Sequence, residues 1–139
     1  MITLSPRLSF FLALTKSEST ATRLFDARLG GLSFNEFIML YHLSQSKNEK
    51  MRRIDLAERV GLTASGITRL IAPMEKIGLV KREASEHDAR VSNVALAPGG
   101  KRKLTEAMED AELLAKDLTQ SIPQKKISDA AALLEQLGK

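Results

Sequence analysis

The first thirty residues carry apolar positions with helical spacing, interrupted by a polar stretch at residues 16–20. Ser5 followed by Pro6 is typical of a helix start, because serine caps the first turn and proline fits the first helical position. Gly30 and Gly31 are expected to end this helix. Its apolar positions are Leu8, Phe11, Leu12, Leu24 and Phe25.

A second helix is predicted to begin at Ser33. The run Ser33-Phe34-Asn35-Glu36 forms a capping box, in which the Ser33 side chain bonds the Glu36 amide and the Glu36 side chain returns to the Ser33 amide. We expect the helix to end near Ser44 and residues 45–49 to form a polar loop. The apolar stripe of this helix consists of Phe34, Phe37, Ile38 and Tyr41.

Two short apolar stripes between residues 54 and 77 are separated by a glycine. Gly61 provides positive φ for a turn, Thr63 caps the helix that follows, and Ala57 is small where two helices would cross. Two short helices joined by a glycine-bearing turn indicate a helix-turn-helix. The predicted buried positions are Ile54, Ala57 and Val60 in the first helix and Ile67, Leu70, Ile71 and Met74 in the second.

After Gly78 the pattern changes from helical to extended. Residues 79–83 and 92–96 are predicted to be two short strands around a charged loop at 84–91, which is a hairpin of the kind called a wing. Pro98-Gly99-Gly100 is expected to break the chain before a long amphipathic helix, and a last helix is expected after Pro123. The buried face of the long helix is predicted to carry Leu104, Ala107, Met108, Ala111, Leu114, Ala115 and Leu118.

This order of elements resembles the MarR family of bacterial regulators. The most specific part is residues 67–82, where Gly78-Leu79-Val80 leads to Arg82, and the wing tip then carries Asp88-Ala89-Arg90. Leu96 and Gly100 also fit the family pattern, and the resemblance extends from Leu8 to Leu137. The family usually has Leu-Thr after the second wing strand, whereas this chain has Leu96-Ala97-Pro98, so the next helix lacks that threonine cap.

The fold class predicted from these patterns is mainly α, a winged helix-turn-helix with a two-stranded β-wing and terminal helices that form a dimerisation lobe. We expect a dimerisation helix at 1–32, a DNA-binding lobe at 33–98 and C-terminal helices completing the interface at 99–139. The apolar faces of the terminal helices exceed what so small a domain can cover. The resemblance implies that they interlock between two subunits through Leu8, Phe11, Leu12, Ile127, Leu133, Leu134 and Leu137.

Net positive charge is concentrated in the middle of the chain. The segment from Lys50 to Lys103 holds 12 Lys and Arg against 6 Asp and Glu, a net charge of +6, whereas the rest nets −2. A basic middle between near-neutral ends is typical of a module that binds a polyanion such as double-stranded DNA. A solvated charged surface is the alternative.

Several function classes find no support in the sequence. The chain has no cysteine and two separated histidines, so neither a thiolate nucleophile nor a metal site is expected. No motif brings a catalytic set together and no phosphate-binding loop is present, so we expect no cofactor and no enzymatic activity. No apolar run approaches the roughly 20 residues that span a membrane, which favours a cytoplasmic location.

Candidate DNA contacts follow from the helix-turn-helix and the wing. A recognition helix reads base edges from its N-terminal half, here with Thr63, Ser65, Thr68 and Arg69, while Gly66 lets the backbone approach. The resemblance implies that Arg90 enters the minor groove, that Asp88 orients it, and that Arg82 supports the wing or contacts phosphates. A solvated Arg69 and an exposed Asp88–Arg90 pair worth about 0–1 kcal/mol are the alternatives.

The expected function is that of a DNA-binding transcriptional regulator, more a repressor than an activator, acting as a homodimer on a pseudo-palindromic operator. A winged-helix module that docks other proteins is the competing hypothesis. The resemblance further implies release from DNA by a small aromatic or phenolic effector. Its pocket would lie around Phe11, Phe37, Tyr41 and Met51.

Overall fold

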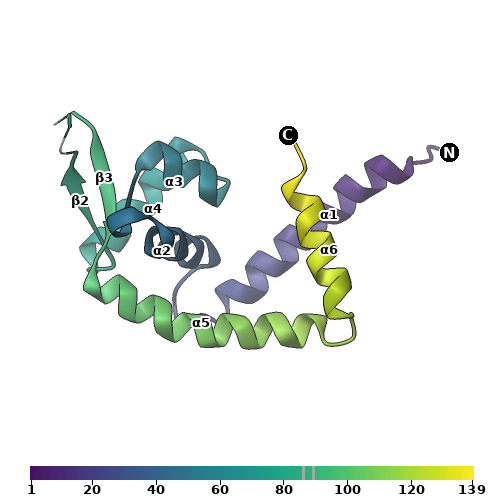
Figure 1. The fold of residues 1–139 in the computed structure, drawn as a ribbon. Helices are drawn as coiled ribbons and strands as arrows, with labels where there is room; N and C mark the ends of the chain where they lie inside the picture. Colours follow the sequence, from purple (N-terminus) through teal and green to yellow (C-terminus); the bar gives the residue numbers. More distant parts are fainter. Residues whose placement is uncertain (86, 89) are drawn as a thin grey trace.

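The computed structural model describes residues 1–85, 87, 88 and 90–139 and is mainly helical, with one small antiparallel sheet (Figure 1). One lobe holds the sheet and three helices, α5 runs along its base, and α1 and α6 lie beyond it. The described elements are α1 (Pro6–Asp26), α2 (Phe34–Gln45), a 3-10 turn (Lys47–Glu49), β1 (Lys50–Arg52), α3 (Arg53–Val60), α4 (Ala64–Lys76), β2 (Val80–Ala84), β3 (Ser92–Leu96), α5 (Pro98–Thr119) and α6 (Gln124–Glu135).

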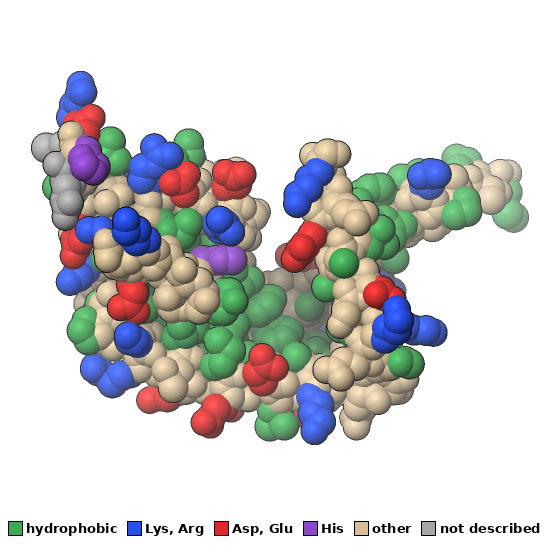
Figure 2. Space-filling view, viewed as in Figure 1, with side chains coloured by type: hydrophobic (Ala, Val, Ile, Leu, Met, Phe, Trp, Pro, Cys, Tyr) green, Lys and Arg blue, Asp and Glu red, His purple; other side chains and the backbone are tan. Residues whose placement is uncertain are grey.

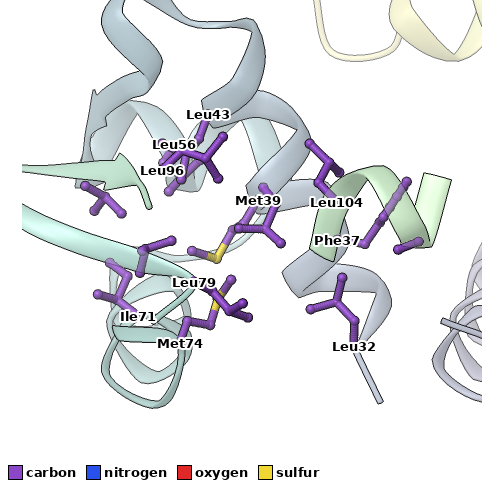
Figure 3. Packing of buried hydrophobic residues seen from close by; sticks show 14 of the residues in the cluster. Leu32, Phe37, Met39, Leu43, Leu56, Ile71, Met74, Leu79, Leu96 and Leu104 are labelled. Carbon is purple, nitrogen blue, oxygen red and sulfur yellow. The ribbon is translucent and has the colours of Figure 1, made fainter. Parts of the chain in front are cut away.

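The hydrophobic core lies where α2, α3 and α4 pack together with the sheet and the first half of α5. Figure 3 shows side chains from these elements directed into one common cluster. Burial of this apolar surface is the main favourable contribution to folding of the lobe. The large side chains that are almost completely buried are Leu29, Met39, Leu40, Leu43, Leu56, Ile67, Ile71, Met74, Val80 and Val94.

The structure corrects the predicted buried face of α3. Ile54 was expected to face the core, but it is 64% exposed, whereas Leu56 is fully buried. Two residues turn a helix by about 200°, so Ile54 and Leu56 cannot share a face. Leu56 and Ala57 carry the contact with the core, and Ile54 remains on the surface.

Local sequence signals for the start of α2, the end of α3 and the start of α4 are confirmed, whereas α1 ends at Asp26, before the predicted stop at Gly30. The capping box at Ser33 is formed, with 2.8 Å from the Ser33 amide to a Glu36 carboxylate oxygen and 3.1 Å from the Glu36 amide to the Ser33 hydroxyl. Gly61 ends α3 with φ of 80°, and the Thr63 hydroxyl caps α4 by accepting from the Gly66 amide at 3.0 Å. These caps satisfy backbone donors within a few residues, which explains why sequence alone locates them.

The sheet contains a strand that the sequence pattern did not predict. Its order is β1-β3-β2, with Lys50 opposite Ala95 on one side and Val80 opposite Leu96 on the other. The two-stranded wing is therefore the outer part of a three-stranded antiparallel sheet. β1 has three residues, Lys50 to Arg52, and so short a segment carries no recognisable period.

Helix α5 begins earlier than expected, at Pro98, and continues through Gly99 and Gly100. These glycines do not break the chain; they allow close packing. A Cβ on Gly100 would collide with the Leu79 carbonyl oxygen, and one on Gly99 would lie 2.7 Å from the Gly78 carbonyl oxygen. Ala97 occupies the N-cap position and provides no side-chain hydrogen bond, as the departure from the family pattern implied.

The terminal helices leave their apolar faces uncovered. Neither α1 nor α6 has a buried residue, and Leu118 near the end of α5 is 45% exposed, contrary to the predicted buried face, because α5 extends past the lobe. Figure 2 shows hydrophobic side chains lining the hollow between the lobe and these helices. Within the described residues, no helix has an apolar stretch long enough to cross a membrane.

Candidate nucleic-acid interface

The N-terminal half of α4 presents polar side chains on its solvent side while Ile67 anchors the opposite side in the core. Ser65, Thr68 and Arg69 are exposed, whereas Ile67 is fully buried. The predicted recognition residues therefore share an accessible surface at the start of the second helix of the helix-turn-helix. This is the part of such a helix that enters a major groove.

Two of the predicted contact residues also have structural roles within the chain. The Thr63 hydroxyl is engaged as the cap of α4. A Cβ placed on Gly66 would lie 3.3 Å from that hydroxyl oxygen and 3.5 Å from the Leu62 side chain, so the missing side chain gives room to the turn before α4. A close approach of the Gly66 backbone to DNA stays a prediction.

Thr68 is held from two directions. Its hydroxyl donates to the Ala64 carbonyl oxygen at 3.0 Å and accepts from the Arg53 guanidinium (Nη1) at 3.2 Å. Arg53 begins α3, fifteen residues before Thr68, so this bond links the two helices of the motif. The sequence alone does not predict this bond, because no local pattern indicates a contact between residues so far apart.

Arg69 lies in the same groove as Thr68 and Arg53. Among the described residues, no carboxylate lies within 4.0 Å of its nitrogen atoms. A shallow groove of about 600 Å³ runs between α3 and α4, and its lining includes Arg53, Ile54, Ala64, Ser65, Thr68 and Arg69. An uncompensated guanidinium at the edge of this groove suits a guanine edge or a phosphate.

At the wing, Arg90 extends into solvent with its side chain 91% exposed. Asp88 Oδ1 accepts from the Arg90 amide at 3.0 Å and from its Nε at 3.2 Å, and Asp88 Oδ2 accepts from Nη2 at 3.4 Å. These bonds lower the pKa of the Asp88 carboxyl below its ordinary value, the backbone bond contributing most. Asp88 and Arg90 thus form a compact ionic tip, and Ala89 between them is outside the described residues.

The stem of the wing is tied to the lobe by ion pairs. Arg82 of β2 lies 3.5 Å from Glu75 near the end of α4. Glu83 pairs with Lys81 at 3.3 Å and Lys50 at 3.5 Å, and hydrogen bonding from Lys81 is the largest cause that lowers the pKa of Glu83. Arg82 is therefore positioned to hold the wing against α4, which agrees with the supporting role expected for it. Figure 2 shows Lys and Arg side chains gathered over this lobe.

Part of the expected effector site is brought together between α2 and α5. Phe37 and Tyr41 line an apolar groove of about 330 Å³ with Phe25, Phe34 and Met108. The rings of Phe25 and Phe34 stack at 4.3 Å between centroids. Met51 lies instead on β1, beside the polar pocket under the wing, and Phe11 lies on the exposed part of α1.

Among the described residues, no cluster of three or more His, Cys, Asp or Glu side chains could hold a metal ion.

His42, in α2, is partly buried. Its pKa lies below 6.5, mainly because of this burial and to a smaller extent because of the nearby Arg59 charge.

Residues 30–91 match the model of the MarR family, a segment that contains α2, the helix-turn-helix and the wing up to residue 91. Over this segment the chain is similar to the MarR family. The resemblance drawn from residues 67–82 and the wing tip is thereby confirmed. Members of this family are transcriptional regulators.

Solved structures of transcriptional regulators share the fold over nearly the whole chain. BldR from Sulfolobus solfataricus is 25% identical, with a TM-score of 0.85 over 99% of this chain and 100% of its own. Sco3205 from Streptomyces coelicolor, solved in complex with DNA, is 17% identical, with a TM-score of 0.84 over 99% and 89%. PcaV from the same organism, solved with its natural ligand, is 14% identical, with a TM-score of 0.84 over 99% and 96%.

Proposed function

We propose that this protein is a sequence-specific transcriptional regulator that binds double-stranded DNA as a homodimer on a pseudo-palindromic operator. The observation that carries the proposal is the pairing of two exposed cationic elements in one lobe. Arg69 lies at the accessible side of α4, and Arg90 stands at the tip of a wing that Arg82 ties to the same helix. A major-groove helix and a minor-groove arginine would read DNA together.

Homodimerisation is supported by the uncovered faces of the terminal helices. The residues proposed for this interface are between 36% and 51% exposed, namely Leu8, Phe11, Leu12, Ile127, Leu133, Leu134 and Leu137. Side chains of this type cluster at interfaces when so many occur on one surface. A second copy related by a twofold axis would cover them and place two recognition helices about 34–36 Å apart.

Repression and release by an effector are separate parts of the proposal, and each has its own support. A dimer seated over a promoter excludes polymerase sterically, which makes repression the proposed mode. Release is assigned to a small aromatic or phenolic effector, because the groove between α2 and α5 is lined by Phe25, Phe34, Phe37 and Tyr41. Such a groove at the junction with the terminal helices would couple ligand occupancy to the spacing of the two lobes.

The test is fluorescence anisotropy of the protein with DNA from upstream of its own gene and with a scrambled duplex, across a salt series. Arg69→Ala and Arg90→Ala should each weaken specific binding by about 1–3 kcal/mol, or roughly 5- to 150-fold. Arg28→Ala, an exposed arginine after α1, is the matched control and should bind as the wild type does.

Each outcome decides between the candidate functions. Tight binding to the upstream duplex, with a steep salt slope and losses in both variants, supports a sequence-specific regulator. Equal weak binding to both duplexes leaves only a basic surface. A folded dimer that binds no genomic fragment in a pull-down of sheared DNA contradicts the proposal and favours a protein-docking module. An effector is tested separately, by release of bound DNA with a panel of phenols and aromatic acids.

A further inference from the structure

The groove between α3 and α4 combines an exposed apolar floor with cationic edges. Ile54 is 64% exposed, and it lies in the same groove as Ala64 and Thr68. Arg53 and Arg69 border that groove. The carboxylate nearest in sequence, Asp55, is already paired with Arg52 at 3.0 Å. The groove therefore offers a ligand both apolar side chains and two guanidinium groups.

The hydrogen bonding of Thr68 restricts what this residue can offer to DNA. A threonine hydroxyl has one donor hydrogen, and here that hydrogen goes to the Ala64 carbonyl oxygen. One lone pair is occupied by the Arg53 guanidinium. Thr68 therefore has no donor left for a base, and its methyl group becomes its main contact surface. In a major groove, the partner for an apolar side chain is the C5-methyl group of thymine.

We propose that Ile54, Ala64 and the methyl group of Thr68 form a thymine-methyl subsite, and that Arg53 is a positioning residue that fixes Thr68 in the required orientation. This inference rests on the proposed function, since it specifies how the recognition helix reads one base. Arg69 would then contact the base or phosphate beside that thymine. Ile54 becomes a specificity-determining residue on α3, outside the recognition helix itself.

The experiment replaces thymine by deoxyuridine, one position at a time, in the operator that the full-length protein binds. This change removes only the C5-methyl group and leaves every hydrogen-bonding atom in place. One position in each half-site should weaken wild-type binding about fourfold, the effect of burying one methyl group. The measured quantity is the ratio of Kd values for the uracil and thymine duplexes.

Variants at the subsite separate the methyl contact from the hydroxyl. Ile54→Ala and Thr68→Ser should bring the ratio toward one, because each removes apolar surface from the subsite. Thr68→Val, which keeps a methyl group and loses the hydroxyl, should retain a ratio of about four. Thermal melting of each variant shows whether it is folded. A Thr68→Ser protein that keeps the full ratio overturns the assignment of Thr68, and an unchanged Ile54→Ala overturns that of Ile54.

The role of Arg53 is tested by the same ratio. If it acts through Thr68, Arg53→Ala should lower the ratio in the wild-type background and leave it unchanged in the Thr68→Val background. If Arg53 only holds a phosphate, Arg53→Ala weakens binding to both duplexes equally and reduces the salt slope by about 0.9, which overturns the positioning role.

Failure of this inference is distinguishable from failure of the proposed function. Specific binding to an operator in which no uracil position has an effect overturns the thymine subsite and leaves the regulator intact. Absence of any specific binding contradicts the proposed function itself.

Discussion

Arg69 and Arg90 are held in different ways, which changes what each can contribute at the residue scale. The Arg90 guanidinium is oriented by Asp88 through two side-chain bonds, so less rotamer entropy remains to be lost when it enters a groove. Arg69 has no carboxylate partner within 4.0 Å among the described residues and keeps its full charge for a new partner. The wing arginine is therefore pre-oriented, and the helix arginine is free to adapt.

The partly buried His42 predicts a pH dependence of stability. Its pKa in the folded protein lies below 6.5, first because of burial and then because of the Arg59 charge. The unfolded chain takes up a proton at higher pH than the folded one, so stability should fall as pH drops through about 6.5 and level off below the folded pKa. The lowered pKa values of Asp88 and Glu83 affect the stability of the protein only at more acidic pH.

Urea denaturation between pH 7.5 and 5.5 measures this effect. The unfolding midpoint of the wild type should decrease over the interval, and that of His42→Gln should decrease less. His87→Gln, which replaces the exposed histidine of the wing loop, is the control and should follow the wild type. A decrease of equal size in all three proteins would assign the pH dependence to other groups.

At the scale of the element, α5 begins without a side-chain cap. Ala97 has the extended conformation of an N-cap residue, with φ of −87° and ψ of 160°, but its side chain has no oxygen to accept from the amides of the first turn. Pro98 then occupies the first helical position, and two glycines follow it in the tight packing against Gly78 and Leu79. The start of α5 is thus determined by packing, whereas α1, α2 and α4 each begin at a residue whose hydroxyl caps the helix.

Ala97→Thr should stabilise the protein by about 1 kcal/mol, because its hydroxyl can accept a hydrogen bond from the Gly99 or Gly100 amide. Ala97→Val has the same shape without the hydroxyl and is the matched control. Chemical denaturation of the two variants isolates the cap, and equal stability of the threonine and valine proteins would show that no cap bond forms.

At the scale of the whole molecule, the uncovered terminal helices decide the expected assembly. α5 connects the lobe to α6, and Figure 1 shows α6 and α1 standing apart from the lobe. Among the described residues, Phe25 at the end of α1 packs against the core of the lobe, but the other apolar side chains of α1 and α6 are not part of that core. In a dimer with a twofold axis, α1 and α6 of both subunits would lie in the interface. The stability of the folded protein is therefore expected to depend on protein concentration.

Leu133→Glu should therefore weaken the dimer by at least about a hundredfold in Kd, since each copy loses roughly 1.5 kcal/mol or more of apolar burial and gains a buried charge. Ile77→Glu is the matched control, because Ile77 is 69% exposed at the end of α4 in the lobe. Sedimentation equilibrium over a concentration series gives both values. A monomeric wild type, or equal weakening by the two substitutions, would contradict an interface on the terminal helices.

Several features of the fold could be predicted because their signals are local. The capping box at Ser33, the left-handed Gly61 and the change to extended period after Gly78 all depend on residues within one or two turns of each other. Strand β1 and the exposed Ile54 could not be predicted in this way. β1 exists only by pairing with β3, and Ile54 is exposed because α3 uses Leu56 and Ala57 for its contact with the core.

The amino-acid sequence predicts the order of the helices, the helix-turn-helix, the wing and the exposed polar residues of α4, because periodicity, caps and turns are short-range properties of the chain. Which contacts join these parts depends on how the chain folds. Arg53 reaches Thr68, Arg82 reaches Glu75, and Gly100 packs against the Leu79 carbonyl, each across a separation that carries no periodic signal. Those contacts depend on how elements meet in space, and folding alone brings their partners together.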